Sequence, residues 1–354
     1  MAYISFKPQD YFNTKLYDGS SSTWNAHTGV GFQPNMAWLK FRTGSGTAWN
    51  GICDSVRGVD ADPGCAAVYP NETSAEGTST TEYLDGFQSD GFTTGVNATF
   101  GANGYTYAGW CWKAPTTTGL SGGTITPSGY SIDTTAKQGI YTFTGTGSNA
   151  TIAHGLGVAP AMVFVKKRGA TGSWMVYHKY CNSSPGTKVG YLNDTVAFGS
   201  GTAVWNSTTA TDTLVSVGTD SDVNGSAATF VMYAWGEAKG YSKAGIYEGT
   251  GSSDATPYIY TGFRPAFILI KSTNNTSNWV VFDDKRQGYN VNNDSLRINN
   301  TDAENDDDQI NIFANGFRPR ATNVQVNQSS AYYVYMAFAN NPMVGSNGNP
   351  VLGR

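Results

Sequence analysis

Two short stretches place acidic and basic side chains together in a way that could support catalysis. Asp54 stands three residues before Arg57, and Asp283 and Asp284 stand just before Arg286. Two carboxylates that flank one glycosidic bond are the machinery of polysaccharide hydrolysis. Here each carboxylate has an arginine as a close neighbour, which is typical of ion pairs at strand ends. We therefore favour a structural role and keep a polysaccharide-degrading hydrolase as the second alternative.

The three histidines, His27, His154 and His178, are spread over separate parts of the chain. His27 and His154 both precede proline-containing elements by a few residues, so we expect them to be structural turn residues. The chain has no nucleophile elbow, phosphate-binding loop or paired-histidine zinc motif. We expect no enzymatic activity and no cofactor.

Two acidic stretches match parts of a calcium-binding loop. The one that starts at Asp220 fits the first half of such a loop, but its twelfth position is Val231 instead of glutamate. The acid run at 302–308 is more typical of a solvated loop. We therefore expect no bound metal, and the calcium candidates that we keep are Asp220, Asp222, Asn224, Asp306 and Asp308.

One motif occurs three times and organises the chain. A lysine follows a proline by six residues, and a tryptophan follows the lysine by eight or nine. The copies are Pro34, Lys40 and Trp49; Pro160, Lys166 and Trp174; and Pro265, Lys271 and Trp279. Such self-similarity indicates three copies of one structural unit. We expect the prolines to mark strand starts and the tryptophans to be core anchors, since each tryptophan can bury about 150–250 Å².

The sequence around each copy is typical of short strands and tight turns. Apolar runs such as 266–270 follow the prolines and predict strands that are covered on both faces. An Asn-x-Thr-x-Ala turn and an aromatic closing strand recur further along each copy. The chain therefore predicts an all-β fold of three tandem antiparallel β-sandwich units, of a jelly-roll or lectin-like kind.

The spacing of the copies predicts the boundaries of these units. The expected segments are an N-terminal lead at 1–16, sandwich units at 17–114, 138–240 and 241–340, a Thr/Gly/Ser-rich connector at 115–137 and a C-terminal tail at 341–354. The connector should be flexible, with room for one added strand. We expect the second and third units to pack closely and the first to be freer.

Composition limits the possible partners. Charged residues make up only 14% of the chain and the net charge is −4, so no basic surface for nucleic acid is expected. No apolar run reaches the roughly 18 residues that a membrane span requires. The start of the chain lacks the features of a secretion signal, which indicates assembly in a cytoplasm.

The four cysteines are Cys53, Cys65, Cys111 and Cys181, and their spacing matches no metal-binding motif. Without a secretion signal we expect free, half-buried thiols. Cys53 and Cys65 are the nearest pair for a disulfide if one forms.

Several stretches together resemble a known group of proteins. They are the Gly-Phe-x-Pro motif with its following lysine and the stretches 54–58, 85–92 and 107–113. These are similar to the repeated fibre-like or lectin-like β domains of cyanophage- and pelagiphage-like virion proteins, from tailed phages of marine bacteria. The resemblance covers most of 1–340 and is clearest in the first copy. The second copy departs from it, with His178 and Lys179 where the other copies carry aspartate and arginine.

The resemblance implies a place in the virion, in the capsid, tail or fibre, and no defined activity. We therefore expect a bacteriophage virion structural protein that forms or decorates a fibre, spike or surface layer and contributes to host attachment. Implied partners are copies of itself (a trimer, by analogy with fibres), other virion proteins of the capsid or tail, and a host surface glycan. The protein would be localised in the virion after assembly in the host cytoplasm. The first alternative is a carbohydrate-binding adhesin, whose sugar-stacking residues would be loop tyrosines and Trp24, Trp110, Trp112, Trp205 and Trp235.

Overall fold

The computed structural model is described over residues 6–44, 46, 48–58, 65–79, 82–286, 290 and 292–339. Within this part nearly all regular structure is β-strand, which confirms the predicted all-β class. The helical pieces there are short: η1 (Pro8–Asp10), η2 (Pro185–Thr187), α1 (Thr202–Trp205) and α2 (Ser221–Asn224). No helix of the described residues is long and apolar enough to cross a membrane.

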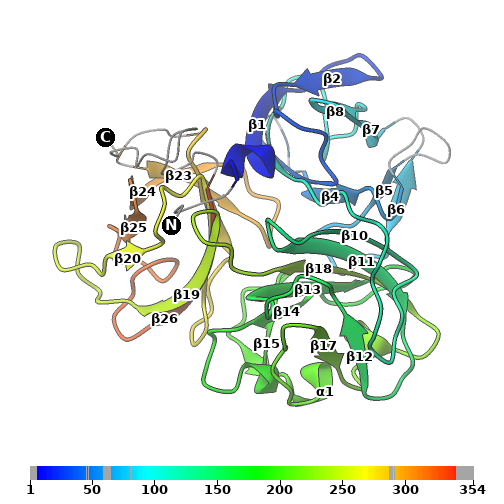
Figure 1. Cartoon of the computed structure of the whole chain (residues 1–354). Helices are drawn as coiled ribbons and strands as arrows, with labels where there is room; N and C mark the ends of the chain where they lie inside the picture. The colour runs from blue at the N-terminus through cyan, green and yellow to red at the C-terminus, as the bar shows by residue number, and fades with distance from the viewer. Residues whose placement is uncertain are drawn as a thin grey trace.

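Three antiparallel sheets form the framework of the molecule (Figure 1). The first sheet has the order β1 (Phe12–Asp18), β9 (Thr106–Trp112), β3 (Met36–Thr43), β4 (Gly51–Asp54). The second has the order β10 (Gly129–Asp133), β11 (Gln138–Thr144), β18 (Thr229–Trp235), β13 (Met162–Lys167), β14 (Met175–His178), β15 (Lys188–Tyr191), β16 (Gly199–Ser200). The third has the order β19 (Ser242–Glu248), β26 (Tyr332–Phe338), β21 (Phe267–Ser272), β22 (Val280–Asp283), β23 (Asn292–Arg297), β24 (Asn305–Phe313), β25 (Gly316–Pro319), β20 (Ile259–Tyr260).

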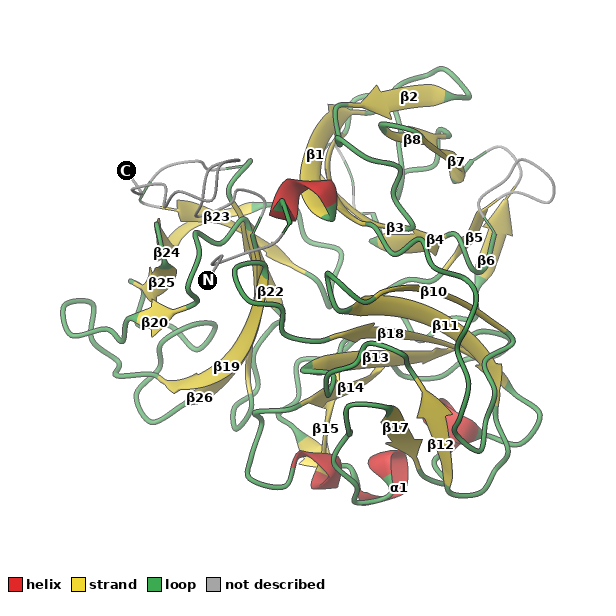
Figure 2. Ribbon diagram, in the orientation of Figure 1, coloured by secondary structure: helices red, strands yellow, loops and turns green. Residues whose placement is uncertain are grey.

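Smaller sheets accompany the framework (Figure 2). They are β2 (Asn25–Thr28) with β8 (Gly91–Thr94) and β7 (Leu84–Gln88); β12 (Ala150–Ala153) with β17 (Leu214–Val217); and β5 (Cys65–Ala67) with β6 (Gly77–Ser79).

The same four-strand order occurs in all three large sheets. The opening strand pairs with the closing strand of its copy, and the closing strand pairs with the strand that follows the repeated proline. Even the register is equivalent, because Met36 faces Trp112, Met162 faces Trp235 and Phe267 faces Phe338. The proline-to-lysine spacing thus reflects one strand geometry that is used three times.

The inner faces of the three sheets meet in one shared apolar core. Its members include Phe12, Trp38, Trp110 and Trp112 of the first sheet, Met162, Phe164 and Trp235 of the second, and Phe267, Leu269 and Phe338 of the third. Rings contact one another across sheet boundaries, as in Trp38 with Phe164 and Phe12 with Phe267. The residual void at the centre is only about 10 Å³, so the core has no room for a ligand.

The outer face of each sheet packs on a separate apolar cluster of its own. In the strand that starts at Met36, alternate residues such as Trp38 belong to the shared core, whereas Ala37 and Leu39 belong to the outer cluster of the first sheet. The second and third sheets have equivalent outer clusters. Each sheet is therefore covered on both faces, and this explains the continuous apolar runs of its strands.

The expectation that the first unit is freer than the others is wrong, because its inner face supplies four large aromatic rings to the shared core. The predicted lead at 1–16 also overlaps β1, which begins at Phe12. The connector at 115–137 contributes the added strand β10. The tail at 341–354 lies outside the described residues.

Candidate functional site

The three repeated lysines lie buried at the three junctions between sheets. Each Nζ donates to a backbone carbonyl oxygen in a loop of a neighbouring sheet. The pairs are Lys40 with Asn300 at 2.9 Å, Lys166 with Thr73 at 3.2 Å and Lys271 with Thr195 at 2.8 Å. The first sheet thus contacts the third, the second contacts the first and the third contacts the second. The three sheets therefore form a closed ring of contacts.

Burial lowers the pKa of Lys40 to about 7, that of Lys166 to about 8 and that of Lys271 to about 7. Lysines with such pKa values serve as nucleophiles in some enzymes. Here, however, the ammonium groups are aimed at carbonyl oxygens, and Lys271 also donates to Ser277 O at 2.6 Å. Their geometry is that of cross-links between loops.

Two of the repeated tryptophans make the same contact at successive junctions. Trp174 and Trp279 are fully buried. Their Nε1 atoms donate to Tyr69 O and Tyr191 O, both at 2.8 Å, in the neighbouring sheet. These side chains therefore pack in the interior and join neighbouring sheets.

The expectation that Trp49 is a core anchor is wrong, since its side chain is 40% exposed. The equivalent buried position is occupied by Asn50, whose Nδ2 donates to Ile298 O of the third sheet at 2.8 Å. Asn50 Oδ1 in turn accepts from Trp38 Nε1 at 2.8 Å. The loop after Lys40 is two residues longer, so Trp49 is moved onto the surface beside Tyr69.

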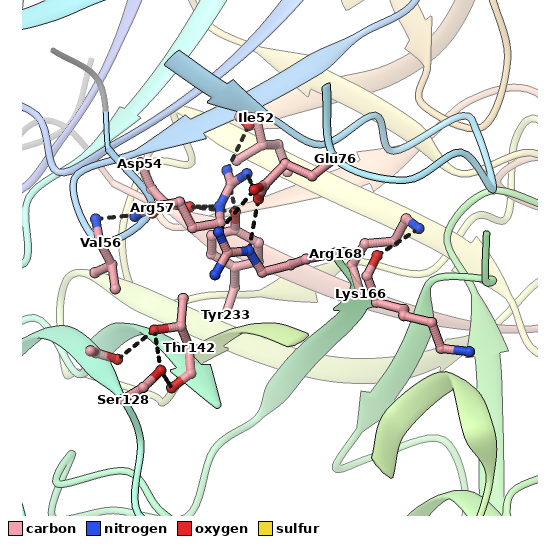
Figure 3. A network of polar contacts seen from close by, with 12 residues as sticks. Ile52, Asp54, Val56, Arg57, Glu76, Ser128, Thr142, Lys166, Arg168 and Tyr233 are labelled. Carbon is pink, nitrogen blue, oxygen red and sulfur yellow. Dashed lines mark hydrogen bonds and ion pairs between the residues drawn. The ribbon is translucent and has the colours of Figure 1, made fainter. Parts of the chain in front are cut away.

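A buried ionic network joins the first and second sheets (Figure 3). Arg57 donates from Nε to Asp54 Oδ2 at 2.6 Å and from Nη1 to Glu76 Oε2 at 2.9 Å. From the second sheet, Arg168 binds both oxygens of Glu76 at 2.8 Å. The Tyr233 hydroxyl donates to Asp54 Oδ2 at 2.7 Å. The side chains of Asp54 and Arg57 are completely buried, so the network is closed to solvent at its centre.

The charges in this network reinforce one another. Burial acts to lower the pKa of Arg57, but the charge of Asp54 outweighs it and the pKa rises. Burial acts to raise the pKa of Glu76, but hydrogen bonds and charge from Arg168 and Arg57 outweigh burial, and the pKa of Glu76 is lowered. Arg57 and Glu76 are therefore held in their charged forms.

The junction between the third and first sheets repeats the arrangement. Arg286 Nε donates to Asp283 Oδ2 at 2.7 Å, and its Nη1 donates to Glu304 Oε2 at 3.1 Å. Arg42 of the first sheet binds both oxygens of Glu304. Trp110 Nε1 donates to Asp283 Oδ2 at 3.0 Å, in the place of the tyrosine hydroxyl.

The junction between the second and third sheets has uncharged residues in the equivalent places. His178 occupies the position of the aspartates in the ladder, as its pairing with Met162 shows. Cys181 stands three residues later, where the other junctions have arginine. Phe198 replaces the glutamate, because its backbone N–H bonds Thr273 O as Glu76 N–H bonds Arg168 O. The whole set has changed together.

His178 is held as a neutral imidazole by two hydrogen bonds of opposite sense. Its Nδ1 accepts from the Tyr180 N–H at 3.2 Å, which fixes the proton on Nε2. Nε2 then donates to Tyr335 O at 3.1 Å in the third sheet. Burial lowers the pKa of His178 to about 4.

These contacts leave the predicted acid pairs without the geometry of a glycosidase. Asp54 and Asp283 belong to different junctions, each is bound by an arginine, and both side chains are fully buried. A glycoside hydrolase needs two carboxyl groups that face one bond of a bound sugar. The structure assigns both aspartates to inter-sheet ion networks.

The two other histidines are buried as well. His27 lies within the strand β2 instead of a turn, and its Nε2 shares a hydrogen bond with Thr94 Oγ1 at 2.8 Å. His154 directly follows β12, and its Nδ1 accepts from the Leu156 N–H at 3.2 Å.

The calcium candidates take part in local hydrogen bonds. Asp220 caps α2 through the Asp222 N–H, and Asp222 pairs with Lys167 at 3.0 Å. Asn224 is buried, and its Oδ1 accepts from the Thr146 N–H in the loop that follows β11. Asp306 and Asp308 lie in the strand β24 rather than in a solvated loop, and the side chain of Asp308 lies outside the described part. No group of three or more acidic, histidine or cysteine side chains among the described residues could hold a metal ion.

The cysteines differ from the expected set of free thiols. Cys53 is disulfide-bonded, whereas Cys111 and Cys181 are free and buried. The side chain of Cys65, the pairing partner that the sequence favours, lies outside the described part. Burial raises the pKa of Cys181 to about 11, so this thiol is unreactive at neutral pH.

Most of the tryptophans considered for sugar stacking are interior residues. Trp110, Trp112, Trp205 and Trp235 are buried, and only Trp24 of this set is exposed, at 39%. Large exposed aromatic side chains gather instead in the third sheet. Tyr258 is 48% exposed, and Tyr260, in the edge strand β20, is 60% exposed.

The fold and the junctions define an all-β protein in which three sheets of one strand order are cross-linked into a ring. The chain belongs to the family described as a domain of unknown function (DUF7483), which matches residues 7–342. The match spans all three sheets, as expected where one core is shared by the whole chain. No curated protein matches this sequence.

Proposed function

We propose that this chain is a structural protein of a bacteriophage virion, built from three tandem β-sandwich units, that forms or decorates a fibre, spike or surface layer. One observation carries the proposal: the side chains that recur between copies and could do chemistry are used to join the sheets. The lysines, the Asp–Arg pairs and two of the tryptophans all cross a junction. A protein whose charged groups act as internal cross-links suits a mechanical role better than a catalytic one.

The sandwich assignment is supported by the packing of each outer face. In the second sheet, Val163 and Val165 pack outward on a cluster that includes Ile152 of β12 and Val215 of β17. The outer cluster of the first sheet includes residues of β7 and β8, and that of the third sheet includes residues of β20 and β25. This packing supports a two-layer unit for each copy, with the three large sheets around the shared core.

The family resemblance of the sequence supports the virion as the site of action. Few charged residues and many hydroxyl and amide groups suit polar contacts with further copies and with other capsid or tail proteins. Host attachment through a surface glycan fits the same place in the particle.

A carbohydrate-binding adhesin is the second candidate, because Tyr258 and Tyr260 present two exposed aromatic rings on one edge of the third sheet. Exposed aromatic rings of this kind stack on sugars. The two candidates are compatible, since an adhesin can be part of a virion.

Mass spectrometry of purified particles, followed by image reconstruction, tests the virion proposal. We expect the chain in many copies at the particle surface, with a density of three β layers around one centre. Absence of the chain from purified particles would contradict it. Release of reducing ends from host polysaccharide, lost in Asp54→Asn or Asp283→Asn, would favour the hydrolase instead.

A further inference from the structure

The one added strand in the threefold repetition builds a cleft on the surface. β10 pairs with β11 and covers its edge, whereas the equivalent strands β1 and β19 are outermost in their sheets. β10 lies beside the loop that follows β4 of the first sheet. Between them is a cleft of about 410 Å³, which we name the β10 cleft. Its lining includes Asn35, Ser55, Val56, Thr117, Ser128 and Tyr130.

The lining is polar but uncharged. Hydroxyl and amide groups predominate, and the described lining residues include no carboxylate, ammonium or guanidinium group. Asn35 Nδ2 donates to Ser55 Oγ at 3.2 Å, so the Ser55 hydroxyl keeps its own proton for a ligand. The Tyr130 side chain packs with Leu120 on the outer cluster of the second sheet, on the other face of β10 from Gly129 and Ser131. The cleft can therefore offer donors and acceptors without a charge.

One wall of the cleft is held in place by its own hydrogen bonds. Asp54 Oδ1 accepts from the Val56 N–H at 3.0 Å and the Arg57 N–H at 2.9 Å, so the ionic network holds the loop that forms one wall (Figure 3). Asn35 Oδ1 accepts from the Ala114 N–H at 2.8 Å and ties that wall to the connector. Groups held in place before binding lose little conformational freedom when a ligand arrives.

We propose that the β10 cleft binds a neutral saccharide. Its volume lies within the roughly 300–1,000 Å³ of small-ligand sites, enough for about one or two sugar rings. Asn35, Ser55 and Thr117 supply hydrogen bonds to sugar hydroxyls. An acidic sugar would need a cation that the lining lacks, and a peptide would need apolar pockets where only Val56 is aliphatic. The proposal rests on the role in host attachment proposed above and identifies the β10 cleft as the place where the glycan would bind.

Binding of neutral saccharides by the whole chain tests this proposal. An array of glucose, galactose, mannose and N-acetylglucosamine oligosaccharides, with acidic oligosaccharides beside them, identifies a ligand for calorimetric titration. We expect a neutral oligosaccharide to bind with a dissociation constant of about 1 mM or below. Thr117→Trp, which fills the cleft from an exposed position, should abolish binding. Ser55→Ala, which removes a hydroxyl from the lining, should weaken binding by about threefold or more.

Tyr332→Ala is the control, because it removes an exposed tyrosine from β26 of the third sheet, outside the lining of the cleft, and should leave the affinity unchanged. Equal thermal unfolding of Thr117→Trp and the unaltered chain would show that its fold is intact. Three results would overturn the proposal: no neutral saccharide bound at up to about 10 mM, a preference for acidic sugars, or binding that persists in Thr117→Trp.

The cleft and the virion proposal fail in different ways. Particles that contain the chain while the purified chain binds no saccharide would overturn the cleft and leave the virion role standing. A chain that binds saccharide through the cleft but is absent from particles would do the reverse.

Discussion

Arg57 and Arg286 each hold a buried aspartate and a glutamate, and each set is completed by side chains from the adjacent sheet. The junction between the second and third sheets has His178, Cys181 and Phe198 in the places of the aspartate, the arginine and the glutamate. A buried ion network and a packed apolar group of similar volume can be nearly equal in free energy, whereas a network that has lost one partner is costly. This explains why the members change as a set and why none of them is replaced singly.

Arg57→Met tests this account of the junctions. We expect the free energy of unfolding to fall by about 3–5 kcal/mol, because Asp54 would be left buried without its partner. Chemical denaturation followed by tryptophan fluorescence measures the loss. Arg297→Met is the control, since its pair with Asp302 is partly exposed and should contribute about 1 kcal/mol or less. Equal effects of the two substitutions would contradict the account.

His178 predicts a loss of stability in acid. Its pKa is about 4 in the folded chain and about 6.5 when unfolded. Between these values the unfolded chain binds the proton first, so stability present above about pH 6.5 falls as the pH drops towards 4 and levels off below. His178→Asn should reduce the fall between pH 7 and 4.5 by about 2–3 kcal/mol.

His27, with a pKa also lowered to about 4 by burial, titrates in the same range and remains in the variant as an internal reference. Parallel pH profiles for His178→Asn and the unaltered chain would rule out this role for His178.

At the scale of elements, the strands were predictable and one loop was not. The six-residue spacing from proline to lysine correctly predicted the strands β3, β13 and β21. Side chains in a strand alternate between its two faces, so equal spacing puts equivalent residues on the same face in each copy. Trp49 matched the motif by spacing alone, but its loop is longer and Asn50 takes the interior place. The sequence did hold a signal for the junctions: glutamate follows the Asn-x-Thr-x-Ala turn in the two copies that carry Asp and Arg, and Phe198 follows it in the copy that carries neither.

Trp279→Ala and Trp49→Ala separate these two positions. Trp279 is fully buried and bonds Tyr191, so its truncation should cost about 3–5 kcal/mol. Trp49→Ala removes a half-exposed side chain and should cost about 1 kcal/mol or less. Thermal and chemical unfolding measure both. A larger loss for Trp49→Ala would mean that the repeat motif, and not the observed packing, identifies the core.

At the scale of the whole molecule, the sequence indicated strands buried on both faces but not what covers them. Apolar runs at 162–165 and 266–270 require two neighbours, and local patterns cannot say that the second neighbour is another copy far along the chain. The shared core depends on that long-range contact. Because the core is shared, we expect the three copies to unfold as one cooperative unit and not as three independent domains.

Native-state hydrogen exchange on Leu269→Ala tests this cooperativity most directly. The substitution removes a buried side chain from the inner face of the third sheet and should cost about 2–5 kcal/mol. If the three sheets share one core, the most protected amides of β3 and β13 should lose protection by the same factor as those of β21. Loss of protection confined to the third sheet, with β3 and β13 unchanged, would contradict the account.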